Sequence, residues 1–265
     1  MENAIPYWHV DAFASRPFTG NQAAVMLLDE WLSDDVLRAI AAENLFAETA
    51  FLVPGTSGKA DRELRWFTPA MEIRLCGHAT LAAGHILMGL EPERDAIRFR
   101  TRLAGMLEVR RLGAGYEVAL PAIRTERDEF PEAASALGGS PREVWRNPDR
   151  YNLFLYDSEE EIRALAPDFR SLAALGIDSF TATAPGSDTD VVSRVFVPGA
   201  GVDEDSVTGS AHAVLTPFWA PRLGRDGFTA YQASARGGRL TCRLDGERAW
   251  LGGDCVTVVE GKFYL

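Results

Sequence analysis

The chain has 265 residues, of which 46% are hydrophobic and 25% charged, and its formal net charge is −11. This composition is typical of a globular protein with a full core, and the acidic balance argues against nucleic acids and anionic membrane surfaces as partners. The three cysteines, Cys76, Cys242 and Cys255, fit neither a disulfide framework nor a zinc motif, so we expect a reduced, cytoplasmic location.

Neither a targeting segment nor a membrane segment is predicted. Residues 1–10 show no basic stretch followed by an apolar one, so we expect no signal peptide. The longest uncharged stretches, 75–90 and 206–221, are too short and too polar to span a bilayer.

The first half of the chain is predicted to form strands around one helix. Short alternating or apolar segments bounded by turn residues predict strands at 50–53, 64–67, 97–100 and 116–120. Residues 79–90 are apolar on almost every side, which indicates a helix that is buried all round. A sheet wrapped around that helix would bury it in this way.

The second half of the chain is also predicted to contain strands and one apolar helix, but the helix and the preceding segment differ from those of the first half. Residues 121–141 are charged and contain proline, and they are predicted to form either a hinge between lobes or one exposed helix. Residues 211–220 are predicted to form a helix that the interior Pro217 shortens or bends. Strands at 240–244 and 255–259 are expected to complete the second lobe, and the last of them can cross back to the first.

An internal repeat predicts two similar lobes. The segments 65–69 and 194–198 both read R-x-F-x-P. Each is followed by G-x-A at the start of an apolar segment, at Gly77 and Gly209, which are 132 residues apart.

The spacing upstream of the repeat points the same way. Phe51 precedes Arg65 by 14 residues, and Phe180 precedes Arg194 by the same 14. We therefore predict an α+β fold of two pseudo-symmetric lobes, residues 1–121 and 122–265, with a cleft between them that binds a ligand.

Glu48 lies in the mostly apolar segment 44–51. A carboxyl group that is buried in such surroundings holds its proton more readily, as a proton shuttle near neutral pH requires. The alternative is a glutamate at a strand edge that faces water.

Two glycine-led helix starts are candidate anion sites, at Cys76-Gly77-His78 and at Gly209-Ser210. Free backbone N–H groups and the helix dipole bind carboxylate or phosphate at such positions. His78 could donate a hydrogen bond to the substrate and Cys76 could act as an acid or base, whereas the alternatives are a structural histidine and a small buried thiol. For the second start the alternative is an N-cap with favourable charge–dipole contacts.

Other chemistries lack motifs in this sequence. There is no G-x-S-x-G, H-E-x-x-H or P-loop motif, and residues 113–115 are predicted to form a turn. The four histidines show no metal-ligand spacing: His9, His78, His85 and His212. We expect no metal.

At these clusters the sequence resembles the PhzF family of phenazine-biosynthesis isomerases, and behind it the diaminopimelate epimerase fold. The matching segments run in family order along nearly the whole chain: 11–14, 17–25, 48–51, 65–69, 75–81, 201–205, 208–212 and 235–238.

The resemblance implies that each lobe is a β-barrel-like sheet around a central helix. The family's catalytic residues fall on Glu48, His78, Asp205 and Ser210. The resemblance further implies that the substrate is held by Asn21, Cys76, Gly77 and Gly209. It also implies a small carboxylate-bearing substrate, no cofactor, and a homodimer.

Three functions stay open at this point. The first is a cofactor-independent isomerase in which Glu48 removes and returns a proton. The second is an amino-acid racemase or epimerase that uses Cys76. The epimerases of this fold place a cysteine before each glycine, but Thr208 precedes Gly209 in this chain. The third is a non-catalytic metabolite-binding protein on the same scaffold.

Overall fold

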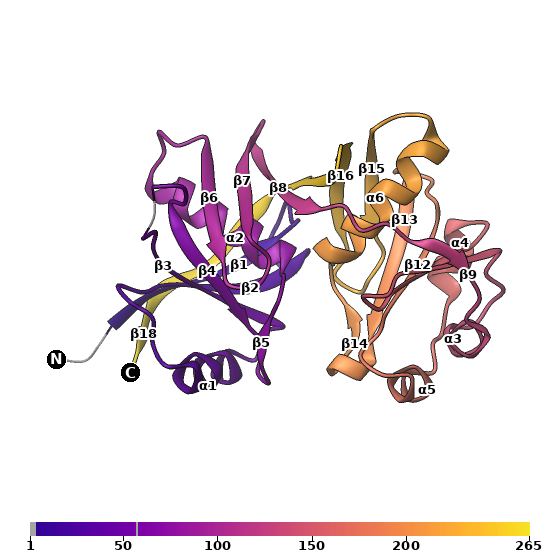
Figure 1. The fold of residues 1–265 in the computed structure, drawn as a ribbon, viewed down its shortest axis with the longest axis horizontal. Coiled ribbons are helices and arrows are strands. Elements are labelled where there is room, and N and C mark those ends of the chain that lie inside the picture. Colours follow the sequence, from indigo (N-terminus) through magenta and orange to yellow (C-terminus); the bar gives the residue numbers. More distant parts are fainter. Residues whose placement is uncertain (1–3, 57) are drawn as a thin grey trace. The chain divides into compact units, whose positions relative to one another are not determined.

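The computed structural model describes residues 4–56 and 58–265, which form two compact units (Figure 1). The first unit runs to Leu120 and also contains Gly252–Leu265, while the second unit is Pro121–Leu251. Glu48 and residues 76–78 belong to the first unit, and residues 205–210 belong to the second.

The first unit is built largely of strands. Its elements are β1 (Ala4–Ala12), β2 (Asn21–Leu27), α1 (Asp34–Asn44), β3 (Glu48–Pro54), β4 (Arg62–Phe67), β5 (Glu72–Ile73), α2 (Gly77–Leu90), β6 (Ala96–Thr101), β7 (Met106–Leu112), β8 (Gly115–Pro121) and β18 (Cys255–Tyr264). The predicted strands correspond to β3, β4, β6 and β8. The turn predicted at 113–115 consists of residues 113 and 114, and Gly115 begins β8.

The strands of the first unit form one continuous set of pairings. β1 pairs with β2, β2 runs parallel to β3, β3 pairs with β4, and β4 pairs with β5 and runs parallel to β6, which continues through β7 to β8. The yellow C-terminal strand β18 pairs antiparallel with β1 along its length (Figure 1).

Helix α2 lies inside this set of strands, because it contacts β1, β2, β3, β6, β7 and β18. Its side chains are buried on every side over the first three turns, as the uniformly apolar sequence predicts. Helix α1 covers the outer face, where Leu37 and Ile40 pack with Phe51, Val53 and Phe67.

The second unit holds the remaining elements. They are β9 (Glu126–Asp128), α3 (Pro131–Leu137), β10 (Glu143–Arg146), β11 (Tyr151–Leu155), α4 (Glu159–Ala164), α5 (Phe169–Ala174), β12 (Ser179–Pro185), β13 (Val191–Val197), the 3-10 turn η1 (Pro198–Ala200), β14 (Val202–Asp205), α6 (Gly209–Leu223), β15 (Gly227–Gln232), β16 (Gly238–Asp245) and β17 (Arg248–Gly253).

The pairings of the second unit repeat those of the first in the same order. β10 pairs with β11, β11 runs parallel to β12, β12 pairs with β13, and β13 pairs with β14 and runs parallel to β15, which pairs with β16. Two similar units therefore follow one another in the chain, each with one long buried helix, α2 or α6.

The equal spacing between phenylalanine and arginine in the two halves does not correspond to an equivalent position in the two units. Phe51 lies opposite Arg65, but Phe180 lies opposite Phe196, and Ala182 is the residue opposite Arg194. The equal spacing of 14 residues was therefore coincidental, because the β3–β4 connection (residues 55–61) is two residues longer than the β12–β13 connection (residues 186–190).

Pro217 predicted a helix that is either short or bent, and the first alternative is wrong. Helix α6 runs from Gly209 to Leu223 with Pro217 in its interior. Proline at that position leaves the Ala213 carbonyl without its helical partner. The backbone N–H of Ile123 donates to this carbonyl at 3.0 Å, so the hydrogen bond that the proline removes is replaced from another segment.

Residues 121–141 are neither a hinge nor one exposed helix. They contain β9 and the short helix α3, and Ala133 and Leu137 of α3 are fully buried. Together with α4 and α5, this helix packs against Phe154 and Phe180 on the outer face of the second sheet.

Among residues 4–56 and 58–265, none of the helices combines the length and the apolar character that crossing a membrane requires.

Gly84 is where α2 approaches β7 most closely. A Cβ atom added there would lie 2.4 Å from Cγ1 of Val109, which is fully buried. We therefore expect Gly84→Ala to lower the free energy of unfolding by about 1–3 kcal/mol through overpacking, although alanine is the better helix former. Denaturant titration measures this change.

Gly89, in the same helix, provides the matched control. An added Cβ atom there meets nothing within 4 Å. Gly89→Ala should raise stability slightly, by up to about 1 kcal/mol. Equal stability of the two variants would contradict the close approach of α2 to β7.

Candidate active site in the first unit

Glu48 is the first residue of β3, directly after the turn that ends α1. It lies opposite Ala23 in the parallel pairing with β2. Leu45 ends α1 in a left-handed conformation, and the Asn44 side chain donates to the Thr49 hydroxyl at 3.0 Å. These contacts fix the strand start, and the Glu48 side chain is only 17% exposed.

Cys76 and His78 come from the start of α2. Cys76 is the N-cap residue in an extended conformation, and both the backbone N–H and the hydroxyl of Thr80 donate to its carbonyl. The first N–H groups of a helix have no partner within that helix, so they are available to an anion. Cys76 and His78 are both almost fully buried.

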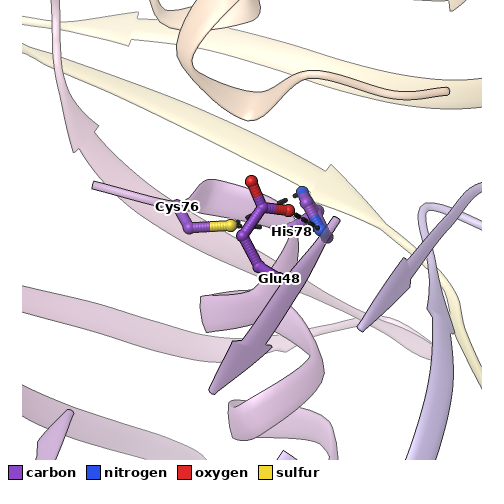
Figure 2. A group of neighbouring side chains, drawn as sticks. All are labelled: Glu48, Cys76 and His78. Atoms are coloured by element: carbon purple, nitrogen blue, oxygen red, sulfur yellow. Dashed lines mark hydrogen bonds and ion pairs between the residues drawn. The ribbon is translucent and has the colours of Figure 1, made fainter. Parts of the chain in front are cut away.

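The three side chains converge, as Figure 2 shows. His78 Nε2 lies 3.1 Å from Glu48 Oε2. The Cys76 sulfur lies 3.6 Å from His78 Nδ1 and 3.9 Å from Nε2. Asn21 Nδ2 lies 3.2 Å from Nδ1 of the same ring. Four of the predicted site residues therefore meet around one imidazole.

The charges in this cluster are set by burial and by proximity. Burial alone would lower the pKa of His78, but the adjacent Cys76 sulfur and Glu48 carboxylate outweigh it and hold that pKa well above its usual value. Burial, and then the Glu48 charge, raise the pKa of the Cys76 thiol. The raised pKa values favour the protonated forms of the imidazole and of the thiol.

The predicted residues of the second unit lie around the start of α6. Asp205 ends β14, and its Oδ2 accepts from the Thr208 hydroxyl at 2.6 Å. Gly209 and Ser210 open the helix after the N-cap Thr208, as Gly77 and His78 open α2 after Cys76. Ser210 therefore holds the position in its unit that His78 holds in the first, and it is half-buried.

Gln232 supports this second cluster and was not predicted from the sequence. It is fully buried; its Oε1 accepts from the Thr208 N–H at 2.8 Å, and its Nε2 donates to the Asp205 carbonyl at 2.8 Å. The only available signal was a polar residue inside the alternating segment 227–232, three residues before the matched segment 235–238.

Comparison with known proteins agrees with this architecture over almost the whole chain. The family model of phenazine biosynthesis-like proteins, PhzC-PhzF, matches residues 10–261. An uncharacterized isomerase of Pseudomonas aeruginosa is 46% identical over 263 residues, covering 98% of this chain and 99% of that protein. A phenazine biosynthesis-like domain-containing protein of Homo sapiens is 35% identical over 283 residues, covering 97% and 98%.

Solved structures show the same fold. A crystal structure of a PhzF-family phenazine biosynthesis protein from Enterococcus faecalis has a TM-score of 0.90 and 40% sequence identity, covering 99% of this chain and all of that one. A hydroxyproline epimerase from Agrobacterium vitis has a TM-score of 0.64 at 13% identity, covering 100% and 94%, and shares the fold alone.

The fold is therefore the mixed α/β fold of diaminopimelate epimerase-like proteins, which includes isomerases and epimerases. The chain belongs to the PhzC-PhzF family of phenazine biosynthesis-like proteins.

Proposed function

We propose that this protein is a cofactor-independent isomerase that moves a proton between two carbons of a small carboxylate-bearing substrate. The observation that carries the proposal is the Glu48 carboxylate at 3.1 Å from the buried His78 Nε2. A carboxylate is a suitable proton carrier, and its position next to the His78 imidazole in a largely buried site suits carbon acid chemistry.

In the proposed reaction, the Glu48 carboxylate takes a proton from a substrate carbon, and the electron pair of that C–H bond moves into the conjugated system. The resulting glutamic acid returns the proton to a second carbon, so that Glu48 ends ionised, as it began. The N–H group of His78 donates to the negative charge that develops in between.

The substrate carboxylate has a candidate position at the start of α2. The backbone N–H groups near Gly77 and the positive end of the helix dipole attract an anion there. The predicted roles of Asp205 and Ser210 in holding the substrate are part of the same proposal.

A second candidate, a racemase or epimerase that uses Cys76, is favoured by one observation. The thiol lies within 4 Å of both ring nitrogens of His78, and the raised pKa of the thiol keeps a transferable proton on its sulfur. In that mechanism a second residue removes a proton from one face of the substrate carbon, and Cys76 gives its own proton to the opposite face.

Heavy-water exchange separates these functions. The protein is incubated in heavy water with a panel of small amino, hydroxy and unsaturated carboxylic acids, and deuterium incorporation into carbon is followed by NMR. An isomerase should incorporate deuterium as it shifts a carbon–carbon double bond of the substrate. A racemase should incorporate deuterium at the α-carbon, with loss of optical rotation. The proposal fails if no member of a broad carboxylate panel exchanges.

Cys76→Ser distinguishes the roles of the two acid–base candidates. The proposed isomerase should retain its exchange rate within a few-fold, because Glu48 carries the proton. A Cys76-dependent racemase should lose on the order of 10²–10⁴-fold, the typical contribution of a general acid or base. Cys242→Ser, which changes a buried thiol of the second unit, is the control for the effect of altering a buried cysteine.

A further inference from the structure

The Glu48, Cys76 and His78 cluster has the composition of a metal site as well as that of an acid–base site. One ligand atom from each residue lies within 4.8 Å of the other two (Figure 2). No metal-ligand spacing is visible along the sequence, because Glu48 comes from β3, whereas Cys76 and His78 come from the start of α2.

Two of the three separations between these atoms are within a few tenths of an ångström of those in a tetrahedral zinc site, and the third, between sulfur and carboxylate, is within 4.8 Å. Zinc bonds of about 2.3 Å to sulfur and about 2.0–2.2 Å to nitrogen or oxygen place neighbouring ligand atoms roughly 3.3–3.6 Å apart. His78 Nε2 lies 3.1 Å from Glu48 Oε2 and 3.9 Å from the Cys76 sulfur. The sulfur also lies 3.6 Å from Nδ1, so the imidazole ring must turn to direct Nε2 at an ion that the sulfur and Oε2 share.

The hydrogen bonding of Glu48 provides a second observation. Its Oε2 is buried and makes no hydrogen bond within residues 4–56 and 58–265, although His78 Nε2 lies at an ion-pair distance. The two groups are close without being aligned for a hydrogen bond. An additional group bound between them would satisfy both.

We propose that Glu48, Cys76 and His78 bind one Zn²⁺ ion, and that the bound ion inhibits the protein. On binding, the Cys76 thiol and the Nε2 nitrogen of His78 each release a proton to solvent, and the sulfur coordinates as a thiolate. His78 coordinates through neutral Nε2 and Glu48 through its carboxylate, so that two negative ligands balance the charge of the ion. Three protein ligands leave the fourth position to water.

The ligand set selects the kind of metal. Thiolate and imidazole favour Zn²⁺ and similar ions, whereas Mg²⁺ and Ca²⁺ require oxygen ligands. Inhibition rests on the proposed function, because the ion occupies the carboxylate that would carry the proton. Metal binding itself rests on the geometry alone.

Asn21 is the outer partner of this site. When Nε2 binds a metal, Nδ1 of the neutral ring carries the proton and needs an acceptor. Rotation of the Asn21 amide would place its oxygen at Nδ1, where its nitrogen now lies at 3.2 Å. Asn21→Asp should place a carboxylate there, and we expect it to tighten zinc binding by about 10-fold or more.

Metal binding is tested on the whole, chelator-treated protein with Zn²⁺ or Co²⁺ alone, in the presence of excess Mg²⁺ to occupy surface carboxylates. We expect one equivalent of Zn²⁺ per chain by competition with a chromophoric chelator. With Co²⁺ we expect a thiolate-to-cobalt absorption band and the intense visible bands of tetrahedral coordination. Cys76→Ala should remove the band, and Cys255→Ala, which changes the other thiol of the first unit, should retain it.

Two results would overturn the site: tight binding without a thiolate band, or unchanged affinity in Cys76→Ala. Because Cys76→Ala could lose binding by misfolding, Asn21→Asp supplies a gain that misfolding does not produce, and unchanged affinity in that variant also counts against the site. If Zn²⁺ binds as expected but the heavy-water panel shows no activity, the metal site stands and the proposed isomerase function fails.

Discussion

Glu48→Gln should reduce proton exchange between substrate and heavy water by on the order of 10²–10⁴-fold while leaving substrate binding nearly unchanged. Glutamine keeps the shape of the side chain but cannot carry the proton. Its amide can still lie 3.1 Å from His78 Nε2, so the surrounding packing should persist. Exchange is followed by NMR and binding by calorimetry, with the substrate that wild type converts.

Glu43→Gln is the matched control for this variant. Glu43 lies on α1, five residues before Glu48, and is exposed to solvent. Its replacement removes the same charge from the same region and should leave exchange at the wild-type rate. Rapid deuterium incorporation in Glu48→Gln would remove the proton-carrier role of this residue.

Acidification should destabilise the protein through His212 in α6, which is fully buried. Burial lowers the pKa of His212 to about 4, although the Thr208 carbonyl, 2.9 Å from its Nδ1, acts in the opposite direction. The unfolded chain, with an ordinary histidine pKa of about 6.5, binds the proton more readily. The contribution of neutral His212 to the free energy of unfolding is therefore fully present above pH 6.5 and is lost as the pH falls towards 4.

The expected size of this effect is about 2–3 kcal/mol in the free energy of unfolding between pH 7 and pH 4.5, from about 1.4 kcal/mol per pKa unit. His212→Asn keeps a donor for the Thr208 carbonyl but cannot titrate. Its stability should depend less on pH by that amount, as measured by urea unfolding at the two pH values. Parallel pH profiles of the variant and wild type would exclude His212 as the cause.

His85 serves as the comparison for His212. It is partly buried and bonds to the hydroxyls of Tyr116 and Thr257. Burial, followed by the charge of Arg111, lowers the pKa of His85. His85→Asn should therefore change the pH dependence in the same direction as His212→Asn, but by less.

Local patterns predicted the parts of the fold that depend on local properties. The burial of α2 follows from an apolar surface on every side, and strands such as β6 and β8 follow from alternation. No helix or strand was predicted within the first 45 residues, although Ser33 followed by two aspartates indicates the start of a helix, α1. Ser33 is the N-cap of that helix.

The remaining features depend on partners far away in the chain, which no local pattern identifies. The length of α6 depends on the Ile123 N–H that reaches the Ala213 carbonyl. The support of Thr208 comes from Gln232, 24 residues later. Glu48 lies at the start of a strand and His78 at the start of a helix. The family resemblance identified both residues, but only the three-dimensional structure shows that they are close together.

The pairing of β18 with β1 has a consequence for the biosynthesis of the protein. The strand that completes the N-terminal sheet is translated only after the entire second unit has been translated. Multidomain chains usually fold from the N-terminal end as they emerge. Here β1 must keep its Ala4–Ala12 edge unpaired until the last segment arrives, so the first unit is nucleated early in synthesis and closed late.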